Sequence, residues 1–120
     1  MSLIFDHDDI NRLDIEIYRG CDFELIIEYK NPLDDITGYK YKSKIIDTNT
    51  GLPVATFHED DFAVDAVAKQ VIMTMDESRT TGITAGTNYL YDVIEITPTE
   101  GQKPPKMWGY VKVFDVAANE

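Results

Sequence analysis

Apolar and polar residues alternate with a period of two along most of this chain, which is the pattern of β-strands that bury one face. Seven segments show the alternation, and turn residues such as Gly, Pro and Asn separate them. They are residues 13–19, 22–30, 39–47, 54–57, 70–75, 87–97 and 107–116. No segment has a convincing helical period. The pattern therefore predicts an all-β protein, a sandwich or a barrel of about seven strands.

The alternation also assigns side chains to the core. On the first three predicted strands, the residues expected to face inward are Leu13, Ile15, Ile17, Phe23, Leu25, Ile27, Tyr29, Tyr39, Tyr41, Ser43 and Ile45. The third strand places Lys40, Lys42 and Lys44 on its opposite face, so we expect a row of lysines in solvent. Residues 63–68 fit either a turn of helix or a loosely ordered strand, and residues 98–105 are expected to form a loop.

The last two predicted strands are apolar on both faces. One face carries Tyr89, Tyr91, Val93, Val111 and Val113, and the opposite face carries Leu90, Ile94, Ile96, Trp108, Tyr110 and Phe114. A sandwich has one core, so only one of these two sets can fill it, and an exposed apolar patch of this kind usually marks an interaction surface. We expect the Trp108 face to be covered by another subunit, with the lysine row at its rim and close enough to pair with Asp92.

Length and composition indicate one soluble domain. At 120 residues with 43% hydrophobic residues, the chain can bury a core without disulfides or metals. The division expected is an N-terminal arm over residues 1–12, which is polar and charged around Asp6-His7-Asp8-Asp9, and a single β-sandwich domain over residues 13–120. The arm is either a disordered lead-in or a segment that orders against a neighbour.

The charge of the chain excludes some partners. With 11 basic and 22 acidic residues the net charge is −11, which argues against nucleic acid and against anionic membrane surfaces. No stretch approaches the roughly 18 apolar residues of a membrane helix, so no membrane partner is expected. Cys21 is the single cysteine, which rules out an intramolecular disulfide, and we expect it to be a small core residue.

The sequence holds no recognisable catalytic constellation, so we expect no enzyme and no cofactor. His7 and His58 lie in acidic segments and are interpreted as solvated surface rather than as metal ligands. Calcium binding by the acidic groups stays open, although none of them has the spacing of a calcium loop. These groups are Asp6/Asp8/Asp9, Asp34/Asp35 and Glu59/Asp60/Asp61. The tyrosines and Trp108 fit a sugar-stacking platform as well as a protein contact.

Three segments resemble small structural proteins of tailed bacteriophages. They are Tyr18-Arg19-Gly20-Cys21-Asp22-Phe23-Glu24-Leu25, Asp35-Ile36-Thr37-Gly38-Tyr39 and Gly86-Thr87-Asn88-Tyr89-Leu90-Tyr91-Asp92. In that family an R-G-D-x-F strand, a D-L-T-G turn and a G-x-Y-x-Y-D strand recur in immunoglobulin-like domains such as the N-terminal domain of baseplate upper proteins. This chain departs from the family by Cys21, by Ile36 and by lacking a long helical assembly region.

The resemblance implies an immunoglobulin-like antiparallel β-sandwich that acts as a non-enzymatic structural or adaptor protein of a virion. It would be made in the host cytoplasm and would assemble, through its sandwich faces and its N-terminal arm, with itself and with other phage structural proteins in a tail, collar or baseplate. It also implies a tyrosine corner at Gly86, Tyr89 and Tyr91, with Tyr89 as the residue whose hydroxyl caps the turn. The alternatives are a carbohydrate-binding module that uses surface aromatics and a capsid decoration protein.

Overall fold

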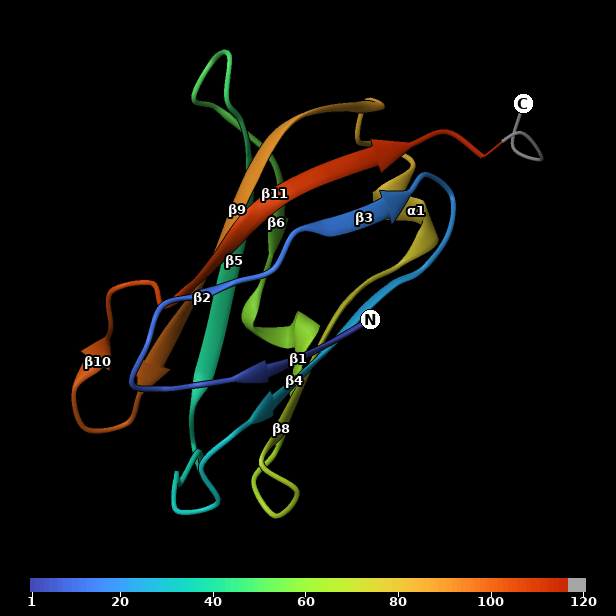
Figure 1. The fold of residues 1–120 in the computed structure, drawn as a ribbon. Coiled ribbons are helices and arrows are strands. Elements are labelled where there is room, and N and C mark those ends of the chain that lie inside the picture. Colours follow the sequence, from blue (N-terminus) through green and yellow to red (C-terminus); the bar gives the residue numbers. More distant parts are fainter. Residues whose placement is uncertain (117–120) are drawn as a thin grey trace.

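The computed structural model describes residues 1–116 and shows two β-sheets packed face to face around one core (Figure 1). The predicted all-β sandwich is confirmed. Residues 117–120, which the sequence assigns to the same domain, lie outside the described part of the chain. Among residues 1–116, neither helix has the length and apolarity of a membrane span.

Each sheet has a defined strand order. In the four-stranded sheet the order is β1 (Ser2–Phe5), β4 (Phe23–Tyr29), β8 (Gln70–Met75) and β7 (Phe62–Asp65). In the seven-stranded sheet the order is β2 (Asn11–Arg12), β11 (Met107–Phe114), β9 (Gly86–Thr97), β5 (Lys40–Asp47) and β6 (Pro53–Phe57), with β3 (Ile15–Tyr18) also on β11 and β10 (Gly101–Gln102) also on β9. The short helices are η1 (Glu59–Asp61) and α1 (Glu77–Thr80).

This strand order is that of an immunoglobulin variable-type sandwich. Strands β1, β4, β8 and β7 correspond to A, B, E and D of that fold, and β11, β9, β5 and β6 correspond to G, F, C and C′. The assignment rests on the hydrogen-bonded pairing within each sheet. The disulfide that commonly links the two sheets of immunoglobulin domains has no counterpart, because the chain has one cysteine. Cys21 is exposed, so the expectation that it lies in the core is wrong.

The core contains most of the side chains that the alternation assigns to it, although Leu13 and Tyr39 are only partly buried and pack against it. Phe23, Leu25 and Ile27 on β4 are at most 6% exposed, and Tyr41 and Ile45 on β5 are at most 2% exposed. On the last two long strands, the inward set is Tyr89, Tyr91, Val93, Val111 and Val113, all buried. One end of the sandwich is closed by α1, where the hydroxyl of buried Thr80 donates to the carbonyl of Cys21.

The N-terminal segment is part of the sandwich, which corrects the prediction of a separate arm over residues 1–12. Strand β1 pairs in parallel with β4, and Phe5 is 4% exposed and packs against Tyr29 at a ring distance of 4.9 Å. Strand β2 pairs with β11. The prediction failed because these strands have only four and two residues, too few for alternation to stand out from a charged background.

The sheets are mixed rather than purely antiparallel, which is a second correction. Strand β1 runs parallel to β4, and β2 and β3 run parallel to β11. Four short strands, β1, β2, β7 and β10, also add to the seven expected. Of the ambiguous residues 63–68, the first three belong to β7, and a turn follows. The expected loop 98–105 contains β10.

The chain between β2 and β3 passes very close to β11. The carbonyl oxygen of Leu13 accepts a hydrogen bond from the hydroxyl of Tyr91 at 2.6 Å. Gly109 lies directly beneath this crossing, where a Cβ atom would lie 1.9 Å from the Leu13 oxygen and 3.0 Å from the Tyr91 ring. Only a residue without a side chain allows the N-terminal chain to lie on the seven-stranded sheet here.

We expect Gly109→Ala to lower the free energy of unfolding by about 3 kcal/mol, because the new methyl group must displace main-chain atoms. Urea unfolding measures this loss. Gly82→Ala is the matched control, since its Cβ would meet only the Arg79 carbonyl oxygen at 3.4 Å. Equal stability of the two variants would contradict the close crossing.

Candidate functional site

The outer face of the seven-stranded sheet carries all six residues expected to form a contact surface. Leu90, Ile94 and Ile96 point outward from β9 and are partly buried. Trp108, Tyr110 and Phe114 point outward from β11, where Tyr110 is 44% and Phe114 37% exposed. The core is complete on the other side of both strands, so the predicted division of the two apolar faces agrees with the structure.

The six residues form separate groups rather than one continuous patch. Tyr110 lies opposite Leu90 across the β9–β11 pair, and its ring is 5.8 Å from the Trp108 ring. Phe114 instead stacks on Tyr18 of β3 at 5.4 Å, at the far end of the strand. Ile94 and Ile96 lie farther along β9 in the other direction. We call Leu90, Trp108 and Tyr110 the aromatic cluster.

Arg12 is a member of this surface that the sequence did not reveal. Its guanidinium carbon lies 5.1 Å from the ring centres of both Trp108 and Tyr110, which is a cation–π geometry. Arg12 also bonds to Asp14 at 3.1 Å, and this bond lowers the pKa of the Asp14 carboxyl. A second bond to Asp14 comes from the main-chain N–H of Tyr110 at 3.0 Å. Arg12 therefore lies over the two aromatic rings, and Asp14 bonds to both Arg12 and the main chain of Tyr110.

The expected pairing of Asp92 with the lysine row is not formed. Lys44 lies directly opposite Asp92 in the β5–β9 register, yet no ion pair joins Asp92 to a cation among residues 1–116. Lys40 bonds instead to Glu59 at 3.7 Å. Asp92 is partly buried, and loss of hydration raises the pKa of its carboxyl.

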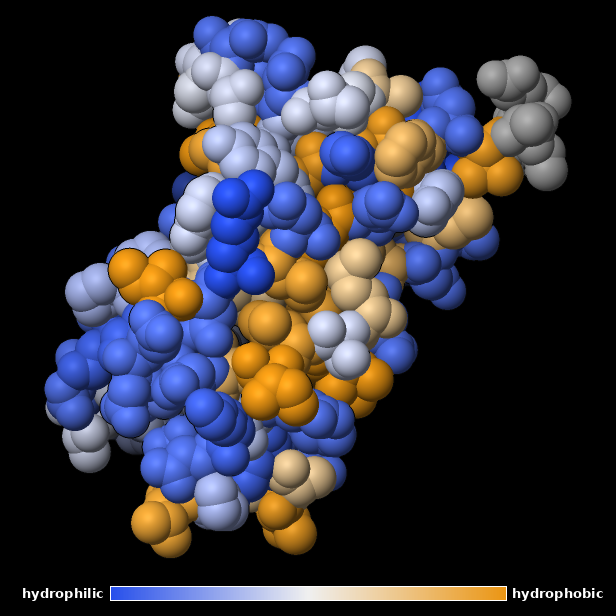
Figure 2. Space-filling view, viewed as in Figure 1, coloured by the Kyte–Doolittle hydropathy of each residue, from blue (hydrophilic) through white to orange (hydrophobic). Residues whose placement is uncertain are grey.

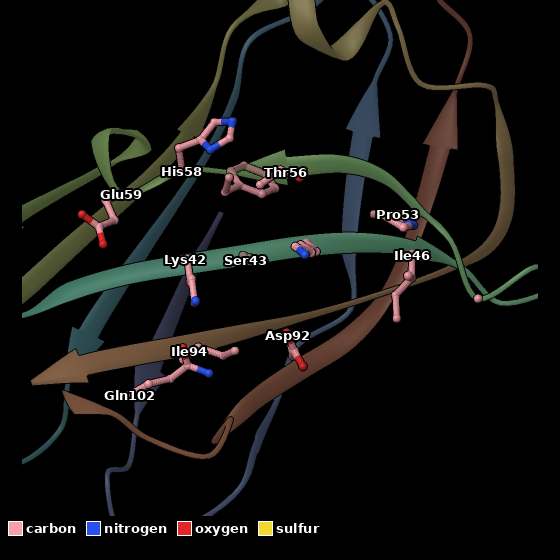
Figure 3. A pocket seen from close by; sticks show the side chains of 13 residues that line it. Lys42, Ser43, Ile46, Pro53, Thr56, His58, Glu59, Asp92, Ile94 and Gln102 are labelled. Atoms are coloured by element: carbon pink, nitrogen blue, oxygen red, sulfur yellow. The ribbon is translucent and has the colours of Figure 1, made fainter. Parts of the chain in front are cut away.

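A groove of about 560 Å³ opens on this face beside the aromatic cluster. Figure 3 shows that Lys42 comes from β5, Asp92 and Ile94 from β9, and His58 and Glu59 from the end of β6 and η1. Apolar side chains contribute as well, among them Ile46 and Pro53. The rings of Trp108, Tyr110 and Phe114 do not line the groove. We call this site the lysine groove.

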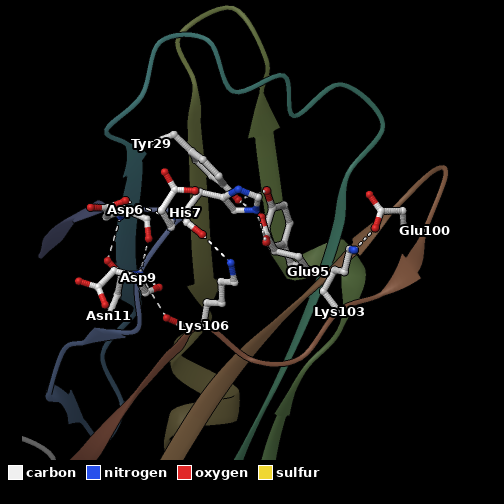
Figure 4. A network of polar contacts seen from close by, with 11 residues as sticks. Asp6, His7, Asp9, Asn11, Tyr29, Glu95, Glu100, Lys103 and Lys106 are labelled. Carbon is white, nitrogen blue, oxygen red and sulfur yellow. Dashed lines mark hydrogen bonds and ion pairs between the residues drawn. The ribbon is translucent and has the colours of Figure 1, made fainter.

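A second polar cluster lies inside the sandwich and escaped the sequence analysis (Figure 4). Glu95 points inward from β9 and is 6% exposed. Its carboxylate accepts the hydroxyl of Tyr29 and lies 3.1 Å from Nε2 of His7, while the hydroxyls of Tyr29 and Tyr41 are 2.8 Å apart. Burial raises the pKa of both tyrosines far above the ordinary value. One signal in the sequence could have identified Glu95: it continues the series Tyr89, Tyr91 and Val93 at steps of two, so the alternation places it on the inner face of the strand.

This cluster fastens the N-terminal turn and leaves no room for a substrate. His7 was interpreted as solvated surface, but its ring reaches Glu95, and its carbonyl accepts Nζ of Lys106 at 2.6 Å. The cavity beside Glu95 measures about 10 Å³, about the least that holds a single water. Across residues 1–116, no three His, Cys, Asp or Glu side chains converge in a way that could hold a metal ion. The arrangement of the cluster therefore fits a structural role, in which its hydrogen bonds hold the N-terminal turn against the sandwich.

The predicted tyrosine corner involves one tyrosine, not two. The hydroxyl of Tyr89 donates to the carbonyl of Thr84 at 2.7 Å, across the turn that leads into β9 at Gly86. This is the contact that defines a tyrosine corner. Tyr91 was grouped with the corner, but its hydroxyl reaches Leu13 instead. Tyr91 stands where the second cysteine of an immunoglobulin domain follows the corner tyrosine.

No family model matches the chain, and no curated protein matches it. The NK cell receptor NKp44, a triggering partner in natural cytotoxicity, has a similar structure at 13% identity and a TM-score of 0.46, covering 88% of this chain and 99% of the receptor chain. A chain in the complex of ICOS with ICOS-L and an anti-ICOS-L VNAR domain reaches 8% identity and a TM-score of 0.39, covering 89% and 56%. Likenesses this distant carry no argument about function.

We expect His7→Ala to lower the free energy of unfolding by about 2 kcal/mol, because it removes a partner from a buried carboxylate. Urea unfolding at neutral pH measures the change. His58→Ala is the control, since His58 is exposed and its main-chain bond to Asp61 survives the substitution. If the two variants lose the same stability, His7 does not fasten the N-terminal turn.

Proposed function

We propose that this protein is a non-enzymatic structural or adaptor component of a phage tail, collar or baseplate. In this proposal its copies assemble through the outer face of the seven-stranded sheet. The observation that carries the assembly is the aromatic cluster, in which Leu90, Trp108 and Tyr110 lie together on a sheet face whose opposite side already fills the core. The phage setting is supported by the sequence motifs alone.

The outer face of the four-stranded sheet is a weaker candidate. Its outward side chains include the apolar pair Ile26 and Ile72, which lie opposite each other on β4 and β8. Glu24 and Glu28 flank Ile26 on the same face of β4. Charged residues are depleted in the centre of protein interfaces, whereas tyrosine, tryptophan and arginine are enriched there. The face that carries Trp108, Tyr110 and Arg12 therefore fits an interface better.

The carbohydrate-binding alternative requires aromatic rings that line a groove, with polar groups beside them. Here the rings and the lysine groove occupy different parts of the face. Arg12 also lies over the two rings on which a sugar would stack. These positions favour a protein partner over a glycan. The non-enzymatic part of the proposal is supported by the tight packing around Glu95.

We expect the solution mass of the protein to rise from monomer to oligomer as its concentration increases from about 1 μM to about 1 mM. We expect Tyr110→Ser to weaken this association about 30-fold, because a central aromatic residue of an interface contributes roughly 2 kcal/mol. Light scattering across the concentration range measures both.

Leu33→Ser is the matched control, because Leu33 is 87% exposed and lies in the loop between β4 and β5, away from the sheet face. We expect it to associate like the unmodified chain. A protein that stays monomeric throughout would contradict the proposal. If Tyr110→Ser and Leu33→Ser lose the same amount of self-association, the outer face is not the interface.

A further inference from the structure

Two lysines of this acidic chain differ from most of its basic residues. Six basic side chains have a carboxylate within 4.0 Å: Arg12, Arg19, Lys30, Lys40, Arg79 and Lys103. Lys42 and Lys44 have none among residues 1–116, and both line the lysine groove. On a chain with a net charge of −11, this groove therefore presents two lysines without a close ion-pair partner, although Asp92 also lines it.

The groove offers more than charge. Ile46, Pro53 and Ile94 contribute apolar surface, and Asp92 contributes one carboxylate against the two ammonium groups. The remaining carboxylate, that of Glu59, is already paired with Lys40. The groove therefore fits a segment that presents carboxylates together with an apolar side chain.

The N-terminal turn between β1 and β2 presents this combination. Asp8 and Asp9 are exposed and have no cationic partner in the described part of the chain, and Ile10 is 69% exposed. Hydrogen bonds within the chain fix the conformation of this turn in the absence of a partner. The side chain of Asn11 accepts the N–H of Asp6 at 2.9 Å and donates to the carbonyl of Asp9 at 3.1 Å. A preformed turn loses little conformational freedom on binding.

The turn and the groove lie at opposite edges of the seven-stranded sheet. The turn leads into β2, at one end of the strand order, while the groove lies between β9, β5 and β6 at the other end. The turn reaches β9 at the inward-facing Glu95, whereas the groove lies on the outer face, and among residues 1–116 neither Asp8 nor Asp9 forms an ion pair with Lys42 or Lys44. Figure 2, viewed as in Figure 1, shows an apolar patch where β1, β4 and β8 lie, bordered by hydrophilic residues.

We propose that the lysine groove of one copy binds the acidic N-terminal turn of a second copy, so that copies join head to tail. This inference rests on the proposed assembly through the outer face, and it names the occupant of one part of that face, the lysine groove beside the aromatic cluster. In the contact, Asp8 and Asp9 meet Lys42 and Lys44, and Ile10 packs on the apolar side chains of the groove. A head-to-tail contact repeats from copy to copy, which produces a ring if the rotation closes and a filament if it does not.

Charge reversal on each side tests the proposal. One variant combines Lys42→Glu with Lys44→Glu, and the other combines Asp8→Lys with Asp9→Lys. Alone, each variant places like charges in the contact, so we expect its self-association to be at least about 10-fold weaker than that of the unmodified chain. Mixed in equal amounts, the two variants pair opposite charges at every contact between unlike copies, whichever of the two supplies the groove. We expect the mixture to recover the oligomer mass in light scattering.

The outcomes separate this inference from the proposed function. A mixture that stays monomeric, or single variants that associate like the unmodified chain, would overturn the head-to-tail contact. If Tyr110→Ser still weakens association in that case, the outer face remains the interface and has a different occupant. An unmodified chain that never associates would overturn both proposals. Recovery in the mixture also shows that both variants are folded, and urea unfolding of each variant checks this independently.

Discussion

Burying the hydroxyls of Tyr89 and Tyr91 and the carboxylate of Glu95 requires a hydrogen-bond partner for each, because an unpaired polar group in the core is costly. All three side chains come from the inner face of β9. Tyr89 bonds locally, to the Thr84 carbonyl across the turn before β9, whereas the partners of Tyr91 and Glu95 come from distant parts of the chain: the Leu13 carbonyl and the side chains of Tyr29 and His7. These bonds place the N-terminal segment against both sheets. Among them, the bond between Tyr29 and Glu95 joins β4 to β9, the two strands that correspond to those joined by the disulfide of many immunoglobulin domains.

The alternation of side chains predicted the long strands and their faces, because each has enough residues for a period of two to be clear. It did not predict β1 and β2, whose positions depend on Phe5 filling a place beside Tyr29 and on Gly109 leaving room for Leu13. Such contacts join residues far apart in the chain and leave no local signal. Glu95 was within reach of the same alternation, but a charged residue is not expected on a core face. Arg12 was missed because the segment around it was assigned to an arm.

The outer face of the seven-stranded sheet combines three kinds of surface, in order across the strands. Charged pairs such as Arg12 and Asp14 lie at the β2 edge, the aromatic cluster lies on β9 and β11, and unpaired lysines lie on β5. Apolar contact contributes binding energy but does not fix the orientation of two copies, whereas complementary charges determine which surfaces of the two copies come together. An acidic protein repels its own copies at most orientations. In the assembly proposed above, this division of the face would favour one defined arrangement of copies.

Trp108 is the only tryptophan in the chain and lies on the outer face beside Tyr110, so its fluorescence reports directly on whether that face is covered. The decisive measurement is the quenching of Trp108 fluorescence by acrylamide, recorded together with solution mass as protein concentration rises. Our account predicts that quenching decreases as the mass increases, because assembly removes Trp108 from solvent. An increase in mass that leaves Trp108 as accessible as in dilute protein would contradict it.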